Sequence, residues 1–261
     1  MKKIIKYPVA ATMAMILCTA CAAFAWPQEK DVFRTSYACY DFKGDQRWQA
    51  TTEISAPADR QKGHYLLVEK GDGYYSGFKG KVSWVATLDF QSNENIVRPL
   101  KMRKEVFDAT RQRVALETQE FDYADNTVEI IYEDLVLEKK RQARFKFSGD
   151  IANQLILGLY VQKFLEQGKQ QTMVEIVSGE PRIYKVRLRQ VKKENIDISG
   201  RSYAAYKLCL DPELGLLSVA KIFLPKAYVW HSSLPKFEWL KYKGLEASLD
   251  SPQVEIRTLD K

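Results

Sequence analysis

The chain has 261 residues, of which 46% are hydrophobic and 28% charged, and its formal net charge is +7 at neutral pH. This apolar content is enough for a folded core and excludes a disordered chain, while the length suits one large β domain or two small domains and not a solenoid. Two histidines and four cysteines leave few residues for metal ligation or nucleophilic catalysis.

The first residues are typical of a secretory signal peptide. Lysines precede a largely apolar run over residues 9–25, which ends in the small-x-small site Ala23-Phe24-Ala25. We therefore expect cleavage after Ala25, a signal peptide over 1–25 and a single periplasmic domain over 26–261. A lipid anchor at Cys21 is the alternative, because Leu17-Cys18-Thr19-Ala20-Cys21 is close to a bacterial lipoprotein box.

Removal of the signal peptide would also remove Lys2, Lys3 and Lys6 and lower the net charge from +7 to +4. The remaining cations are spread along predicted strands, which is typical of a solvated sheet face and not of nucleic-acid binding. No segment of the mature chain is apolar for long enough to form a transmembrane span.

Most of the mature chain is predicted to form strands. At Ile183 to Val191, apolar and cationic residues alternate with the period of a strand that is buried on one face. Short turns rich in Gly, Asn, Asp and Ser separate similar runs. The predicted strands cover 33–42, 47–54, 64–69, 81–90, 96–107, 111–123, 127–132, 172–177, 183–191, 201–210, 219–225, 237–242 and 245–249.

Residues 150–167 instead have helical spacing. Asp150 is the expected N-cap, Gly168 the expected end, and the apolar stripe runs from Ile151 to Phe164. We therefore predict a mainly β fold, a strongly curved antiparallel sheet or half-barrel, with one amphipathic helix packed on its concave side. Cys39 and Cys209 are either a disulfide or two small core residues, and their spacing leaves both interpretations open.

The sequence lacks the common catalytic motifs, so we predict no catalytic residues, no metal site and no cofactor. His64 and His231 are expected to be surface or loop residues, although Ser232 and Ser233 follow His231 directly. Glu120 and Asp122 share a strand face, which is also typical of a solvated edge. A hydrolase centred on His231 is the least favoured interpretation.

Aromatic residues provide more information. Tyr74, Tyr75 and Phe78 lie in a glycine-rich stretch, which could gate an apolar cavity but is more typical of a hairpin that packs on the rim. A second aromatic cluster lies at 230–242, where cross-strand packing is the more common role.

Several short motifs, in this order, make the chain resemble the bacterial periplasmic family called domain of unknown function 3108. They are Val97-Arg98-Pro99-Leu100, Phe121-Asp122-Tyr123, Leu157-Gly158-Leu159-Tyr160, Leu224-Pro225, Leu234-Pro235-Lys236-Phe237-Glu238 and the strand 244–249. That family is similar to the half-barrel lipoprotein carriers LolA and LolB, so the resemblance implies a curved sheet around a hydrophobic cavity. It implies no catalytic residue. The chain departs from the pattern at 230–233.

Two functions are therefore expected. The first is a non-enzymatic envelope protein that binds a hydrophobic or lipid-linked ligand within the sheet. Its candidate cavity residues are Phe78, Trp84, Leu155, Leu159, Tyr184, Val186 and Leu188. The alternative is a structural or interaction module that docks an envelope protein partner through a sheet edge or through Trp230 and Trp239.

Overall fold

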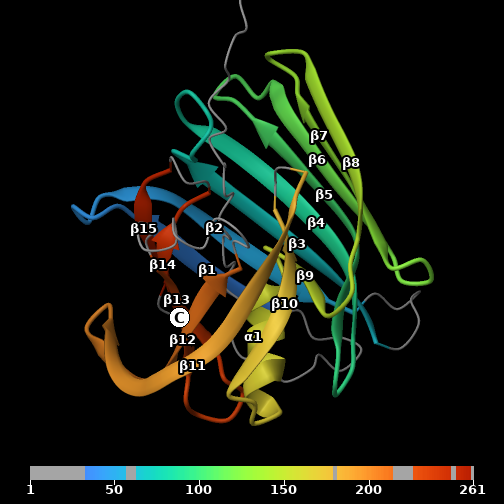
Figure 1. Cartoon of the computed structure of the whole chain (residues 1–261). Coiled ribbons are helices and arrows are strands. Elements are labelled where there is room, and N and C mark those ends of the chain that lie inside the picture. The colour runs from blue at the N-terminus through green and yellow to red at the C-terminus, as the bar shows by residue number, and fades with distance from the viewer. Residues whose placement is uncertain (1–32, 57–62, 179–180, 214–225, 248–250, 260–261) are drawn as a thin grey trace, which may run out of the picture.

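The computed structural model describes residues 33–56, 63–178, 181–213, 226–247 and 251–259. In this part of the chain, fifteen strands form one large curved sheet with a single helix (Figure 1). The strands are β1 (Phe33–Tyr40), β2 (Gln46–Ser55), β3 (His64–Gly73), β4 (Val82–Ser92), β5 (Val97–Phe107), β6 (Arg113–Asp122), β7 (Thr127–Asp134), β8 (Lys139–Lys146), β9 (Ile151–Asn153), β10 (Gln171–Val177), β11 (Ile183–Ile198), β12 (Arg201–Pro212), β13 (Ala227–Ser232), β14 (Trp239–Leu245) and β15 (Gln253–Thr258), and the helix is α1 (Leu157–Glu166).

The sheet consists of two meanders that join between the first and last strands. Strands β1 to β8 follow one another in sequence order, and β15 to β9 continue the sheet from the other side of β1. All pairs are antiparallel except β9–β10, which is parallel. The predicted fold class is therefore confirmed, with β9–β10 as the exception that makes the sheet mixed.

The helix is shorter than the predicted span 150–167. Residues Ile151–Asn153 form β9, because they pair with Glu175–Val177 of β10. The Asn153 side chain then accepts the backbone N–H of Ile156 at 3.3 Å, and the helix starts after that turn. Asp150 does not cap the helix but accepts a hydrogen bond from the Tyr160 hydroxyl at 2.8 Å.

Besides β9, three strands were missed by the alternation rule. β8 is largely exposed, as its sequence KKRQARFK indicates, and a charged, exposed strand is what natural proteins place at a sheet edge. β13 and β15 occupy 227–232 and 253–258. The predicted strand 245–249 is wrong in its described part, because Leu245 ends β14 and the next two residues are in no strand. The predicted strand 219–225 lies outside the described residues.

The sheet closes by side-chain contact. Its two edge strands are β8 and β9, and β9 lies against β5 without pairing with it. We call the apolar contact between β9–β10 and β6–β7 the seam. Asn153 also donates a hydrogen bond to Gln119 across it at 3.3 Å. The buried apolar residues of the seam are Phe121, Val128, Ile130, Phe147, Ile151 and Val177.

A larger set of buried apolar residues fills the inside of the curve. This main core cluster takes residues from β1–β6, β9–β15 and α1. Trp239, Tyr37 and Tyr242 are among its largest fully buried side chains. Figure 1 shows α1 within the curve, between β10–β11 and the N-terminal half of the sheet, as predicted.

Cys39 and Cys209 are buried and are not joined by a disulfide. Cys39 lies on β1 and Cys209 on β12, and three strands separate these two in the sheet. Four strand spacings amount to about 19 Å, whereas a disulfide requires Cα atoms within about 7 Å. The core interpretation of both cysteines is therefore the correct one.

Candidate functional site

A row of polar residues crosses the concave face of the N-terminal meander. The residues of this polar band are directly opposite one another on β1 to β6. Its polar members are Thr35, Thr52, Glu69, Lys104 and Glu117, and Ala86 on β4 lies between Glu69 and Lys104. Three of them carry charge and are at most 7% exposed, although charged side chains are rarely buried to this extent.

Glu69 is held by two aromatic donors. The Tyr37 hydroxyl donates to Oε2, and the Trp84 indole donates to Oε1 at 2.9 Å. Tyr37 also contacts the Thr52 hydroxyl at 3.3 Å. Because both carboxylate oxygens accept a hydrogen bond, the burial of this charge is compensated locally.

Lys104 is 7% exposed, and its ammonium lies 4.5 Å from the centre of the Tyr75 ring and 5.6 Å from that of Trp84. Among the described residues it forms no hydrogen bond or ion pair, so these two rings provide its close contacts. Such cation–π contacts compensate only part of the cost of burying a charge. The interior thus contains a cation whose three N–H donors are unused.

Glu117 is directly opposite Lys104 on β6. Burial raises the pKa of the Glu117 carboxyl, while the Lys104 charge and a 2.8 Å hydrogen bond from Gln119 act in the opposite direction. Gln119 in turn accepts from Asn153 of the seam. The polar band is therefore connected by hydrogen bonds to the start of the helical segment.

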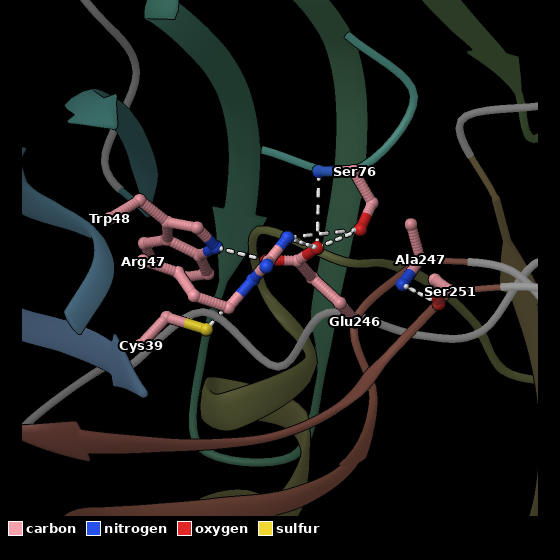
Figure 2. A network of polar contacts seen from close by, with 7 residues as sticks. All are labelled: Cys39, Arg47, Trp48, Ser76, Glu246, Ala247 and Ser251. Atoms are coloured by element: carbon pink, nitrogen blue, oxygen red, sulfur yellow. Dashed lines mark hydrogen bonds and ion pairs between the residues drawn. The ribbon is translucent and has the colours of Figure 1, made fainter. Parts of the chain in front are cut away.

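A further buried carboxylate, Glu246, fixes one end of the sheet (Figure 2). Glu246 is fully buried and accepts from Arg47 at 3.0 and 2.9 Å and from the Trp48 indole at 2.7 Å. The backbone N–H of Ser76 donates to it at 3.1 Å, and the Ser76 hydroxyl donates as well. Hydrogen bonding to Glu246 raises the pKa of Arg47, and burial raises that of the Cys39 thiol beside it.

The Glu246 contacts to Ser76 tether the glycine-rich loop, residues 74–81. Tyr75 of this loop packs against Trp84 and Trp48, with ring centres 5.3 and 6.2 Å apart, and against Phe78 at 6.3 Å. Burial raises the pKa of the Tyr75 hydroxyl well above its usual value. The loop therefore covers this end of the interior with its aromatic side chains, which agrees with the predicted packing on the rim.

The opposite end of the sheet has a pocket of about 190 Å³ beside α1. Its walls come from the β4–β5 turn, the β6–β7 turn, the chain before β9 and the last two turns of α1. Arg98, Lys163 and Lys169 contribute positive charge to the wall, and Asp150 contributes a carboxylate. Phe147 and Phe164 provide an apolar surface, so the pocket is amphipathic.

The seven predicted cavity residues all face the interior. Trp84, Leu155, Leu159, Val186 and Leu188 are buried members of the main core cluster, and Phe78 and Tyr184 pack against it. None of the seven lines the pocket beside α1. The structure thus brings the seven residues together in packed core.

Other candidates are placed where their proposed chemistry is disfavoured. His231 is fully buried, and its Nδ1 contacts the Phe237 carbonyl at 2.8 Å, so the expectation of a surface or loop position is wrong for this residue. Trp230 and Trp239 are at most 5% exposed, which removes them as surface anchors for a partner. Glu120 is paired with Lys101 on an exposed face. The described residues contain no group of three or more potential metal ligands.

The buried charges were not predicted, although the sequence carries a signal for them. Glu69 continues the inward phase of Tyr65 and Leu67 on β3. Lys104 continues the inward phase of Met102 and Val106 on β5. A charged residue in the apolar phase of a strand is a buried polar site that alternation alone can identify. Glu246 has no such signal, since it follows a strand in a loop.

No known protein-family model matches the chain, and no curated protein matches it. The fold is similar to a solved structure described as a β-barrel-like protein of domain of unknown function DUF1849 from Brucella abortus. The TM-score is 0.50 at 8% identity, over 87% of this chain and 95% of that one. The likeness shows the fold alone.

Two further solved structures align over similar lengths with lower scores. The hypothetical lipoprotein YmcC from Escherichia coli has a TM-score of 0.29 and 11% identity, over 87% of each chain. A putative exported protein with a YmcC-like fold from Bacteroides fragilis has a TM-score of 0.30 and 9% identity, over 91% of this chain and 98% of that one. The predicted resemblance to domain of unknown function 3108 and to the lipoprotein carriers receives no support from these matches. In the described ranges, no helix has the length and apolarity of a membrane span.

Proposed function

We propose that the protein is an exported, non-enzymatic protein of the cell envelope that binds a hydrophobic or lipid-linked ligand inside its curved sheet. The observation that carries the proposal is the way the sheet closes. Its interior holds two buried apolar clusters, with the polar band on the N-terminal half of its inner face, and its β9 edge meets β5–β7 through side chains without strand pairing.

Contact through side chains can separate at lower cost than a hydrogen-bonded strand pair. Opening the seam breaks apolar contacts and the hydrogen bond between Asn153 and Gln119, and an apolar ligand would replace the lost contacts. The sheet itself would remain intact, since all its pairings lie elsewhere. The seam is therefore the proposed entrance, and the seven cavity residues are the proposed lining once the ligand is in place.

The location follows from the predicted signal peptide, with cleavage after Ala25 or lipidation at Cys21. Both positions lie outside the described residues. A non-enzymatic role is part of the proposal because His231, on which the hydrolase interpretation depends, is fully buried.

The experiment replaces Leu159 on the inner surface of α1. Leu159→Trp adds bulk to the proposed ligand space, while Leu159→Met conserves volume and is the matched control. Both variants are first checked for a wild-type circular dichroism spectrum and for cooperative unfolding. Uptake of a fluorescent fatty acid is then titrated against each protein.

We expect Leu159→Trp to lower uptake by about tenfold or more, since a clash of this size typically costs 1–3 kcal/mol. Leu159→Met should bind like wild type. Unchanged uptake by a folded Leu159→Trp protein would contradict the proposed location of the ligand.

A further inference from the structure

We propose that the pocket beside α1 binds an anionic head group, a carboxylate or phosphate carried on an apolar chain. This inference rests on the proposed function, because the chain of such a ligand would enter the interior. The inference goes beyond the proposed function because it assigns a negative charge to the ligand and a binding site to its head group.

The pocket has the dimensions of a head-group site. Its volume of about 190 Å³ is below the 300–1,000 Å³ that is usual for a whole drug-sized ligand. A carboxylate or phosphate with a few adjacent carbons would fit, and a long acyl chain would not. Most of the ligand must therefore lie elsewhere.

The wall of the pocket carries cations without carboxylate partners. The Arg98 guanidinium stacks on the Tyr123 ring with its central carbon 5.0 Å from the ring centre, and among the described residues no carboxylate pairs with it. Lys169 is likewise exposed and unpaired in the described structure. A stacked guanidinium is already oriented, and it can donate two parallel hydrogen bonds to a carboxylate or phosphate.

The other charged groups at this site are already engaged. Lys163 pairs with Glu166 at 2.7 Å, so its charge is largely compensated. Asp150, the acidic residue among those that line the pocket, accepts a hydrogen bond from the Tyr160 hydroxyl at 2.8 Å. Two uncompensated cations against one carboxylate leave the pocket positive.

The C-terminal end of α1 adjoins the pocket and would ordinarily repel an anion. However, the last carbonyl groups of α1 already accept hydrogen bonds from the chain that follows the helix. Leu165 accepts from Gly168 at 2.9 Å, Lys163 from Gln167 at 3.0 Å and Phe164 from Lys169 at 3.3 Å.

The apolar wall gives the ligand chain its direction. Phe147 and Ile151 belong to the seam, while Val97 and Phe164 belong to the main core cluster. The pocket thus lies where the two apolar clusters meet. A chain attached to a head group in the pocket would pass between them into the interior.

The test uses four probes on the full mature chain by isothermal titration calorimetry: dodecyl phosphate, dodecanoate, dodecanol and inorganic phosphate. The variant is the double substitution Arg98→Gln and Lys169→Gln. Its matched control is Arg187→Gln with Lys101→Gln, which removes the same charge from exposed residues outside the pocket. Circular dichroism and thermal unfolding establish that both proteins are folded.

Wild type and control should bind the two anionic amphiphiles about tenfold or more tighter than dodecanol, as expected for one charge-assisted hydrogen bond. The pocket variant should lose this preference and keep its affinity for dodecanol. Equal wild-type affinity for dodecyl phosphate and dodecanol would overturn the inference but not the proposed function. No binding of any amphiphile would overturn both. Inorganic phosphate bound as tightly as dodecyl phosphate would overturn the head-group assignment.

Discussion

Lys104 and Glu117 face each other across β5 and β6 on the inner surface of the sheet, and among the described residues no ion pair joins them. Each is at most 7% exposed. Lys104 contacts two aromatic rings, and Glu117 is compensated first by the Lys104 charge and then by the hydrogen bond from Gln119. The two charges still influence each other, because the Lys104 charge lowers the pKa of Glu117 against the effect of burial. They should therefore act as a unit.

A double-mutant cycle tests this coupling. Lys104→Met should destabilise the protein, because it leaves the Glu117 carboxylate buried without a compensating cation. Glu117→Gln should also destabilise it, because it leaves the Lys104 ammonium buried without a nearby anion. The double variant should be more stable than the sum of the single losses predicts, by about 1 kcal/mol or more. Urea unfolding of the four proteins measures the free energies, and strict additivity would contradict the coupling.

Glu117 also predicts a pH dependence. Its folded-state pKa is raised by burial, so the folded protein binds the proton more tightly than the unfolded chain does. The resulting contribution to stability is fully present below the unfolded pKa of about 4.3 and is lost as pH rises through the folded value. Glu117→Gln should remove this pH-dependent loss of stability. The unfolding free energy of the variant, measured relative to that of wild type, should therefore rise between pH 4 and pH 7.

Glu246 tethers the glycine-rich loop, and its replacement should release it. Glu246→Gln breaks the buried contact with Arg47 and should cost about 3 kcal/mol or more of the free energy of unfolding. Limited proteolysis should then cut within residues 74–81, where Ser76 loses its acceptor. The control is Glu213→Gln, which removes an exposed partner of Arg187 and should leave cleavage unchanged. Resistance of the Glu246 variant to proteolysis would contradict the tether.

Because His231 is buried, we expect the free energy of unfolding to fall at acidic pH. Burial lowers the pKa of its imidazole to about 4, whereas the unfolded value is about 6.5. The unfolded chain therefore binds more protons between these values, and up to about 3 kcal/mol of stability is present above pH 6.5 and lost as pH falls towards 4. His231→Asn should flatten the slope of the unfolding free energy in this window. Leu234→Ala, in the exposed turn nearby, should keep the wild-type slope.

Alternation predicted most of the sheet because most strands bury one face only. It failed at β8, where both faces are exposed and the sequence KKRQARFK contains no apolar period. The helix boundary failed for a different reason. Ile151 has helical spacing to Leu155, but its pairing with Glu175 is decided by a partner more than twenty residues away.

The candidate site was predicted only in its apolar part. Six of the seven cavity residues lie on predicted strands or the predicted helix, where periodicity places them inward, and Phe78 was singled out from the aromatic, glycine-rich stretch. The pocket beside α1 combines Arg98, Lys163 and Lys169 from three segments, and this arrangement depends on how the sheet closes at the seam. Local patterns cannot encode that closure, since it brings β9 against β5 without hydrogen bonds.

Native mass spectrometry tests the central claim most directly. The protein would be exported to a bacterial periplasm, purified without detergent, and measured under native and then denaturing conditions. We predict a native mass above the denatured mass by a lipid-sized increment, with the released species anionic. Equal masses in the two measurements, from protein that binds none of the amphiphile probes on titration, would contradict the account.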